Sequence, residues 1–303
     1  MTAKRPSYRK KSVTSGDGTT IGYRQFGHGP GVVLLHGGAL ASQHYMKLGY
    51  ALADDFTVSI PDRRGRGMSG PYGPHYSIER EDEDLAAVVA DTGAQYVFGP
   101  ADGGLFALHG SMAVPAIRKV AVFEPVVFVG QPGLDDFKQV IGRQEGLQAR
   151  GDVAATMAAL TKDAQHDART ATAVSAPYRL LGWAVAQPAV CRLILWLDAK
   201  MVKGDDVALR DLVPALKPEL DLVRATAGTI DDYKNVSAEV LLMCGTEAPP
   251  LFKGTLDALE TVLPRSTRVE LPGANHGAAQ DQGGQPEVIA DQLRRFFSAT
   301  ATS

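Results

Sequence analysis

The stretch YVFGPADGGLFALHG, Tyr96 to Gly110, decides the fold of this 303-residue chain. It opens with β-branched and aromatic residues typical of a buried strand, continues through a glycine-rich turn, and ends in an apolar run with helical character. A strand, a tight turn and a helix in direct succession indicate an α/β sheet of the parallel kind. The centre of the turn is Gly99-Pro100-Ala101-Asp102-Gly103. Whether this turn holds a catalytic residue has to be decided from the rest of the chain.

The rest of the chain repeats this alternation. Two β-prone runs, 7–14 and 20–26, flank SGDG and predict a hairpin. Continuous apolar runs predict buried strands, and helical patterns fill most of the gaps, for example 78–92, 103–113 and 286–298. The strand predictions are 31–38, 56–62, 94–99, 119–125, 238–245 and 267–273. The predicted fold class is therefore α/β, a mostly parallel central sheet with helices on both faces.

One gap is too long for a simple crossover. Residues 131–235 show no strong strand signal and are rich in Ala, Leu, Asp and Arg with helical periodicity. We expect a helical cap inserted over the sheet, which divides the chain into a first core part (1–130), the cap (131–235) and a second core part (236–303). The aromatic residues of the insertion, such as Trp183 and Trp196, are expected in its core or lining a pocket.

Composition narrows the classes of function. The net charge of −3 gives no reason to expect nucleic acid or an anionic membrane as partner. No run reaches about 18 uncharged apolar residues, and the basic start opens no signal peptide, so we expect a cytoplasmic protein without a membrane span. Two cysteines far apart favour a reduced compartment. No metal-ligand spacing and no phosphate loop occur, so the expected partner is a small-molecule substrate and no cofactor is expected.

Four motifs, in this order, resemble the α/β-hydrolase superfamily and cover most of the chain outside the insertion. They are LLHGG (34–38), DRRGRGMS (62–69), GPADGG (99–104) and PGANH (272–276). The resemblance implies an α/β-hydrolase fold in which these turns carry, respectively, an oxyanion loop, a structural loop, the nucleophile elbow and the catalytic histidine. In the second motif, Asp62, Arg63 and Arg64 are expected to brace the loop through charge-assisted hydrogen bonds.

The elbow departs from the family pattern at its central residue. The family has Gly-x-Ser-x-Gly, and here Ala101 stands where the serine belongs. The backbone N–H of Asp102 and one from the His-Gly turn, that of Gly38, would form the oxyanion hole. A register shifted by one residue would make Asp102 the nucleophile, but Pro100 then fits poorly as its small flanking residue. Otherwise the Asp102 side chain is expected to be a solvated carboxylate at the start of a helix.

The resemblance makes His276 the general base, and leaves two candidates for the acid that orients it. Glu124 follows the strand after the elbow, where some relatives place their acid. Glu247 follows the next strand, but Ala248 occupies the position of the usual aspartate. Of the two we prefer Glu124. A carboxylate on Nδ1 of the histidine fixes its tautomer and stabilises the imidazolium ion.

The alanine leaves three functions open. The first is hydrolysis of an ester, lactone or thioester of a small, mostly apolar substrate, with a serine replaced by Ala101, for example deliberately in order to trap a substrate. The second is a non-covalent reaction in which His276 acts as base: a lyase, a cyclase or a cofactor-free oxygenase. The third is a pseudoenzyme that only binds a ligand. We prefer the first, because the glycines of the strained elbow are retained.

Overall fold

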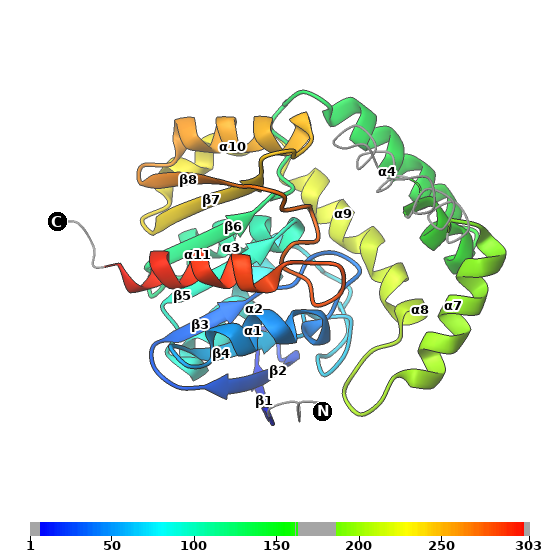
Figure 1. Ribbon diagram of the computed structural model, residues 1–303, viewed down its shortest axis with the longest axis horizontal. Coiled ribbons are helices and arrows are strands. Elements are labelled where there is room, and N and C mark those ends of the chain that lie inside the picture. Colours follow the sequence, from blue (N-terminus) through cyan, green and yellow to red (C-terminus); the bar gives the residue numbers. More distant parts are fainter. Residues whose placement is uncertain (1–6, 161, 163–185, 300–303) are drawn as a thin grey trace.

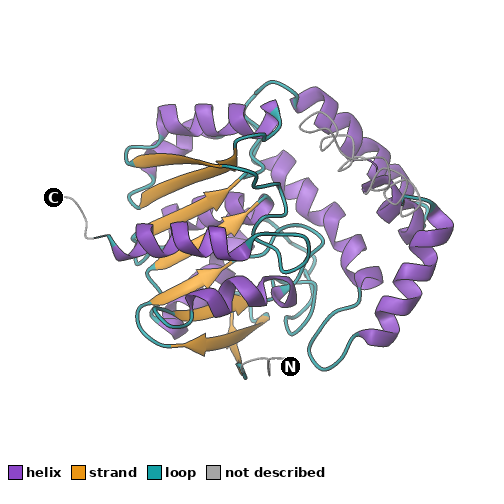
Figure 2. Ribbon diagram, viewed as in Figure 1, coloured by secondary structure: helices purple, strands orange, loops and turns teal. Residues whose placement is uncertain are grey.

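The fold is an eight-stranded sheet flanked by helices (Figures 1 and 2). The computed structural model describes residues 7–160, 162 and 186–299. The strands are β1 (Arg9–Thr14), β2 (Thr20–Gly27), β3 (Gly31–Leu34), β4 (Thr57–Pro61), β5 (Tyr96–Pro100), β6 (Lys119–Phe123), β7 (Glu239–Gly245) and β8 (Ser266–Leu271). Their order in the sheet is β1-β2-β4-β3-β5-β6-β7-β8. Strands β3 to β8 pair in parallel, while β2 pairs antiparallel with both β1 and β4. The predicted fold class is confirmed.

Side chains alternate between the two faces of the sheet, and each face has its own core. Val33, Val97 and Val120 point to a face covered by α2 (Ile78–Thr92), α3 (Asp102–Ala113) and α10 (Pro250–Val262). Their neighbours Leu34 and Phe98 point to the opposite face, covered by α1 (Met46–Leu52) and α11 (Pro286–Ser298). The period of two along each strand and the apolar stripe on each helix together bury both faces.

The helices between β6 and β7 coincide in sequence with the predicted insertion. They include α4 (Leu134–Gln148), a helix over 153–160, α7 (Pro188–Met201), α8 (Leu209–Leu212), η2 (Val213–Ala215), α9 (Leu216–Ala225) and η3 (Ile230–Asn235). Figure 1 shows α4 and α7 on the outer side of α9, away from the sheet, and α8 at the lower end of α9. In turn, α9 packs against α3 and α4, and η3 packs against α10 and α3. The helices α9 and η3 therefore join the insertion to the core.

One prediction for the insertion is wrong. Trp196 is 54% exposed, on a face of α7 that also exposes Leu193 and Met201. The indole lies beneath the Nζ of Lys200, 3.8 Å from the ring centroid, so a cation covers part of it in place of a packed neighbour. Trp183 lies outside the described residues.

The predicted helices 78–92 and 286–298 match α2 and α11 at both ends. The predicted strands 31–38 and 119–125 end earlier, at Leu34 and Phe123. Glu124, directly after Phe123, has a positive φ that a strand cannot accommodate. After Leu34, residues 35–37 are outside regular secondary structure and lead into the turn at 38–39. Among the described helices, none combines the length and apolar character needed to cross a membrane.

Candidate active site

The turns after four parallel strands, β3, β5, β6 and β8, bring the predicted residues to one edge of the sheet. Gly38 follows β3, Ala101 follows β5, Glu124 follows β6 and His276 follows β8. Carboxyl ends of parallel strands meet at a common edge, where open α/β sheets place their ligands. Among the described residues, the non-glycine residues with positive φ are Ala39, Ala101 and Glu124. All three lie in these turns, and backbone strain of this kind concentrates at functional sites.

Ala101 lies at the apex of the turn between β5 and α3. Its φ of 51° and ψ of −129° fall in a region that L residues rarely adopt. Two hydrogen bonds of 3.0 Å hold it there: its N–H donates to the Phe123 carbonyl, and its carbonyl accepts the N–H of Val126. The conformation is thus imposed by the neighbouring strand β6 and the loop that follows it.

The flanking glycines are required by close backbone approach. A Cβ on Gly99 would lie 2.1 Å from the carbonyl oxygen of Gly103, and a Cβ on Gly103 would lie 2.7 Å from that of His36. Both distances are shorter than any side chain tolerates, so only glycine fits at either position. Their spacing around Ala101 is that of the predicted elbow.

Glu124 and His276 form a hydrogen-bonded pair. Oε2 of Glu124 lies 2.8 Å from Nδ1 of His276, and Oε1 accepts the N–H of Gly245 at 3.0 Å. The carboxylate is buried, whereas the imidazole is 45% exposed. The ring of Phe252 stacks on the imidazole, with centroids 4.5 Å apart and planes 13° apart. Glu247, the other candidate acid, is exposed, so the geometry favours Glu124.

The His-Gly turn packs against the side chain of Asp102. The Gly38 N–H donates to Oδ1 of Asp102 at 2.5 Å, and Oδ2 lies 3.3 Å from Nη1 of Arg63. The side chain is buried, so the expectation of a solvated helix-start carboxylate is wrong. Burial, reinforced by the nearby carboxylate of Glu219, raises the pKa of Asp102 to about 6. The turn folds back over the start of α3, which removes this carboxylate from water.

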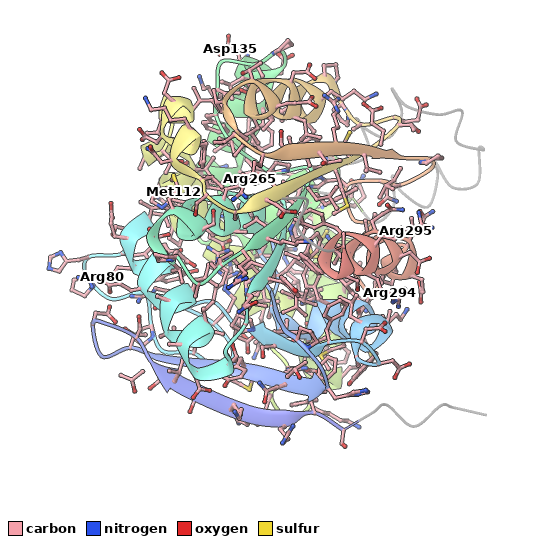
Figure 3. The ribbon with its side chains drawn as sticks, turned by 90° about the vertical axis from the view of Figure 1, so that its left-hand side faces the viewer. Arg80, Met112, Asp135, Arg265, Arg294 and Arg295 are labelled. Carbon is pink, nitrogen blue, oxygen red and sulfur yellow. The ribbon has the colours of Figure 1, made fainter. Side chains whose placement is uncertain are left out.

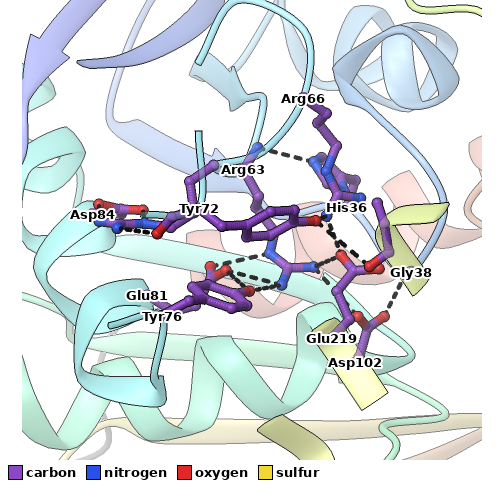
Figure 4. Close-up of polar contacts among 12 residues, drawn as sticks. His36, Gly38, Arg63, Arg66, Tyr72, Tyr76, Glu81, Asp84, Asp102 and Glu219 are labelled. Atoms are coloured by element: carbon purple, nitrogen blue, oxygen red, sulfur yellow. Dashed lines mark hydrogen bonds and ion pairs between the residues drawn. The ribbon is translucent and has the colours of Figure 1, made fainter. Parts of the chain in front are cut away.

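A buried charge cluster backs this turn (Figure 4). Arg63 donates to both oxygens of Glu81, at 3.0 Å each, and to Oε1 of Glu219 at 2.7 Å. Arg66 also contacts Glu219, and its Nη1 donates to the Leu40 carbonyl at 2.9 Å. Oε2 of Glu219 accepts the N–H of Ala39 at 3.1 Å. The loop after β4 and helix α9 therefore fix the His-Gly turn from two sides.

Glu219 and its role were not found from the sequence. It lies on α9 between Leu216 and Val223 at spacings of three and four, on the apolar stripe of that helix. A carboxylate on an apolar stripe signals a buried ion pair, and that signal was available.

The bracing predicted for DRRGRGMS is confirmed in detail. Asp62 accepts the N–H groups of Ser42 at 2.8 Å and Met68 at 3.0 Å. Arg64 forms a bidentate pair with Asp84, both distances being 2.7 Å. Arg63 differs from these two residues, because it reaches the His-Gly turn through its contacts with Glu219 and Asp102.

His36 is a structural residue. Its Nε2 accepts the N–H of Arg63 at 3.0 Å, so the proton lies on Nδ1, which is 3.0 Å from the carbonyl of Gly37. Burial, together with the cations Arg66 and Arg63, lowers the pKa of His36 well below its ordinary value. A neutral imidazole therefore links the turn to the loop after β4.

An open groove of about 660 Å³ lies at the opposite, amino edge of the sheet. Figure 3 views the molecule from that side and labels Arg265, one of the lining residues. Gly38, Ala101, Glu124 and His276 do not line it, so it is separate from the site above. In the described part of the chain, no group of three or more His, Cys, Asp or Glu residues could hold a metal ion.

Comparison with known proteins agrees with this geometry. A model of the alpha/beta hydrolase family matches residues 32–292. The chain belongs to the alpha/beta hydrolase family. This alpha/beta hydrolase is similar over its whole fold to the crystal structure of an alpha/beta hydrolase from Sphaerobacter thermophilus, with 25% identity and a TM-score of 0.68. That comparison covers 95% of this chain and 100% of the other.

Curated relatives match shorter segments. One is the pimeloyl-(acyl-carrier protein) methyl ester esterase of Xanthomonas campestris pv. campestris, 35% identical over 96 residues, which are 32% of this chain and 37% of that protein. Another is a non-heme haloperoxidase of Rhodococcus erythropolis, 31% identical over 123 residues, 38% of this chain and 45% of that protein. The match thus spans less than half the length of either relative.

Proposed function

We propose that this alpha/beta hydrolase is built to hydrolyse an ester, lactone or thioester of a small, mostly apolar substrate, and that Ala101 holds the place of its nucleophile. The observation that carries the proposal is the pairing of Glu124 with His276 at 2.8 Å, on the same sheet edge as an alanine with φ of 51°. The similarity to a methyl ester esterase supports ester chemistry. In this form the protein lacks the hydroxyl that would attack the carbonyl.

The proposed reaction uses residues from four turns, those after β3, β5, β6 and β8. A hydroxyl oxygen on residue 101 would attack the carbonyl carbon while Nε2 of His276 takes its proton. Glu124 would stabilise the imidazolium through Nδ1, and the imidazolium would then protonate the leaving group. The N–H groups of Gly38 and Asp102 would donate to the oxyanion, a contribution of roughly 3–4 kcal/mol per donor in other hydrolases. Water would hydrolyse the acyl-enzyme by the same route.

The substrate would lie between the sheet edge and the insertion, which we propose to be a cap. Leu216 of α9 supports an apolar site, since its Cδ1 lies 3.1 Å from the place where a Cβ on Gly38 would be. Phe252 adds an aromatic wall beside His276. Clefts between a lid and a core commonly hold ligands of this kind.

The test is to restore the hydroxyl. Ala101→Ser should hydrolyse small activated esters and gain the mass of a serine-directed phosphonate, whereas the unaltered chain should do neither. Serine adds one oxygen and no new backbone strain, so the variant should fold. Ala90→Ser, the same change on exposed residue 90 of α2, is the matched control and should stay inert. A folded Ala101→Ser protein that neither labels nor turns over would contradict the proposal.

A second candidate function needs no nucleophile. The Glu124–His276 pair is complete without a side-chain hydroxyl at position 101, so His276 could act as a base on an apolar substrate, as in a lyase, cyclase or cofactor-free oxygenase. Turnover by the unaltered chain, lost in His276→Ala, would support this function. Tight ligand binding without turnover would instead identify a binding protein.

A further inference from the structure

The oxyanion position of this site has an internal occupant. In the proposed function the Gly38 N–H would donate to the oxyanion, yet in the structure it donates at 2.5 Å to the Asp102 carboxylate. A Cβ placed on Gly37 would be 3.4 Å from Cβ of Ala101 and 3.5 Å from Oδ1 of Asp102. The His-Gly turn therefore packs against both the Asp102 carboxylate and the side chain at the nucleophile position.

The surroundings of Asp102 leave its charge incompletely balanced. The buried cluster holds two cations, Arg63 and Arg66, and three carboxylates, Glu81, Glu219 and Asp102. Two positive and three negative charges leave one negative charge in excess. The groups that act on Asp102 come from several elements: Arg63 and Arg66 after β4, Glu219 on α9 and the Gly38 N–H after β3. The charge of Asp102 acts in turn on Tyr45, the last residue of the short helix η1 (Ser42–Tyr45). Glu81 on α2 and the neutral His36 complete the cluster.

We propose that Asp102 is a specificity-determining residue, whose carboxylate occupies the Gly38 N–H in the resting site and must be displaced before a substrate oxyanion can bind. This inference rests on the proposed function. A carboxylate accepts a backbone N–H more strongly than a neutral carbonyl does, so the resting contact competes directly with the substrate. Arg63, on the other carboxylate oxygen, is available to retain Asp102 once it leaves Gly38.

The competition depends on the charge of Asp102. As the carboxylate is protonated, it becomes a weaker acceptor and the Gly38 N–H becomes available to the substrate. At neutral pH the Gly38 N–H is therefore bonded to the Asp102 carboxylate, and under mildly acidic conditions it is available to the substrate. Substrates that carry a negative charge beside the scissile carbonyl would be disfavoured, because they approach an already anionic cluster.

The first experiment does not depend on catalytic activity. In the unaltered chain, the amide proton resonance of Gly38 should move upfield as the pH falls through about 6, because the bond to an ionised acceptor is lost. In Asp102→Asn the resonance should lack this titration. Asp135→Asn makes the same charge change in the first turn of α4 and should leave the Gly38 titration intact. A Gly38 resonance that does not respond to pH in the unaltered chain would overturn the proposal.

The second experiment measures rates in the Ala101→Ser background. Adding Asp102→Asn should raise kcat/KM for a neutral ester roughly 10-fold at pH 8, since a neutral amide is the weaker occupant. At pH 5 the kcat/KM values of the two proteins should agree within about two-fold. Asp102 is then mostly protonated, so like asparagine it is neutral and a weaker acceptor than a carboxylate. A ratio independent of pH indicates a merely structural role and rejects the proposal. If neither protein hydrolyses esters, the proposed function fails, and the Gly38 titration still decides the occupancy.

Discussion

Oε2 of Glu124 lies 2.8 Å from Nδ1 of His276, while Oε1 of the same carboxylate is held by the N–H of Gly245. The second bond fixes the carboxylate plane and so fixes the imidazole. In the Ala101→Ser background, Glu124→Gln should lower kcat by roughly 10³- to 10⁴-fold, because an amide selects the wrong tautomer and cannot stabilise the imidazolium. Steady-state kinetics on an activated ester measures this.

The control for that prediction is Glu247→Gln. Glu247 is exposed in the turn after β7, so its neutralisation should change kcat less than two-fold, within the usual scatter for surface substitutions. Equal losses in both variants would mean that the two carboxylates share the role.

The stacking of Phe252 on His276 gives a separate prediction. The two rings lie 4.5 Å apart and almost parallel, so Phe252 covers one face of the imidazole and limits its tilt. In the Ala101→Ser background, Phe252→Leu should lower kcat about 10-fold with little change in KM, since misorientation of a base affects the chemical step. Phe56→Leu, an equally buried aromatic in the opposite core, is the control for lost packing. A comparable loss of kcat in both variants would contradict a positioning role.

Glu219 should be the most destabilising single position on α9. It is 1% exposed and pairs with both Arg63 and Arg66. Glu219→Ala should lower the free energy of unfolding by about 3–5 kcal/mol, because it leaves the buried Arg66 without its carboxylate partner and removes one of the three carboxylates around Arg63. Asp221→Ala on the same helix removes an exposed carboxylate paired with Lys217 and should cost under about 1 kcal/mol. Urea unfolding compares them; equal midpoints would show that the cluster contributes nothing to stability.

The sequence predicted the sheet, and that the candidate residues lie at one edge of it, because both predictions rest on local signals. Strand periodicity located the turns at Gly38, Ala101 and Glu124, and parallel pairing brings the ends of such strands to one edge. The sequence left both Glu124 and Glu247 open as the acid. Which carboxylate reaches the histidine after β8 depends on three-dimensional distance, which local sequence patterns do not give.

The charge cluster could not be predicted in this way. Asp102 was expected to face water because acidic residues at helix starts usually do. Its burial depends on the fold of the His-Gly turn over α3 and on Glu219, more than a hundred residues later in the chain. Long-range burial of paired charges leaves only a weak trace in the sequence, such as a lone carboxylate on an apolar stripe.

Relief of the backbone strain at Ala101 should be measurable as an increase in the free energy of unfolding. A residue with φ of 51° and ψ of −129° costs about 1–3 kcal/mol unless it is glycine, which exceeds the entropy that glycine gains in the unfolded chain. Ala101→Gly should therefore raise the free energy of unfolding by about 1 kcal/mol. Ala90→Gly, in α2, should instead lower it by about 1 kcal/mol. Destabilisation by both changes would mean that the turn is unstrained.

The raised pKa of Asp102 predicts how stability changes with pH. Its folded value of about 6 lies above its ordinary value of 3.8, mainly because of burial. Between these values the unfolded chain has lost the proton that the folded chain keeps, so stability falls as the pH rises through this window and levels off above about 6. Relative to Asp102→Asn, the unaltered chain should lose up to about 3 kcal/mol of unfolding free energy between pH 4 and pH 7. Chemical denaturation of both proteins at half-unit steps measures the difference. Groups remote from the cluster titrate equally in the two proteins, so the comparison isolates Asp102 together with Glu219, whose charge acts on it. Parallel curves would show that folding does not raise the pKa of Asp102.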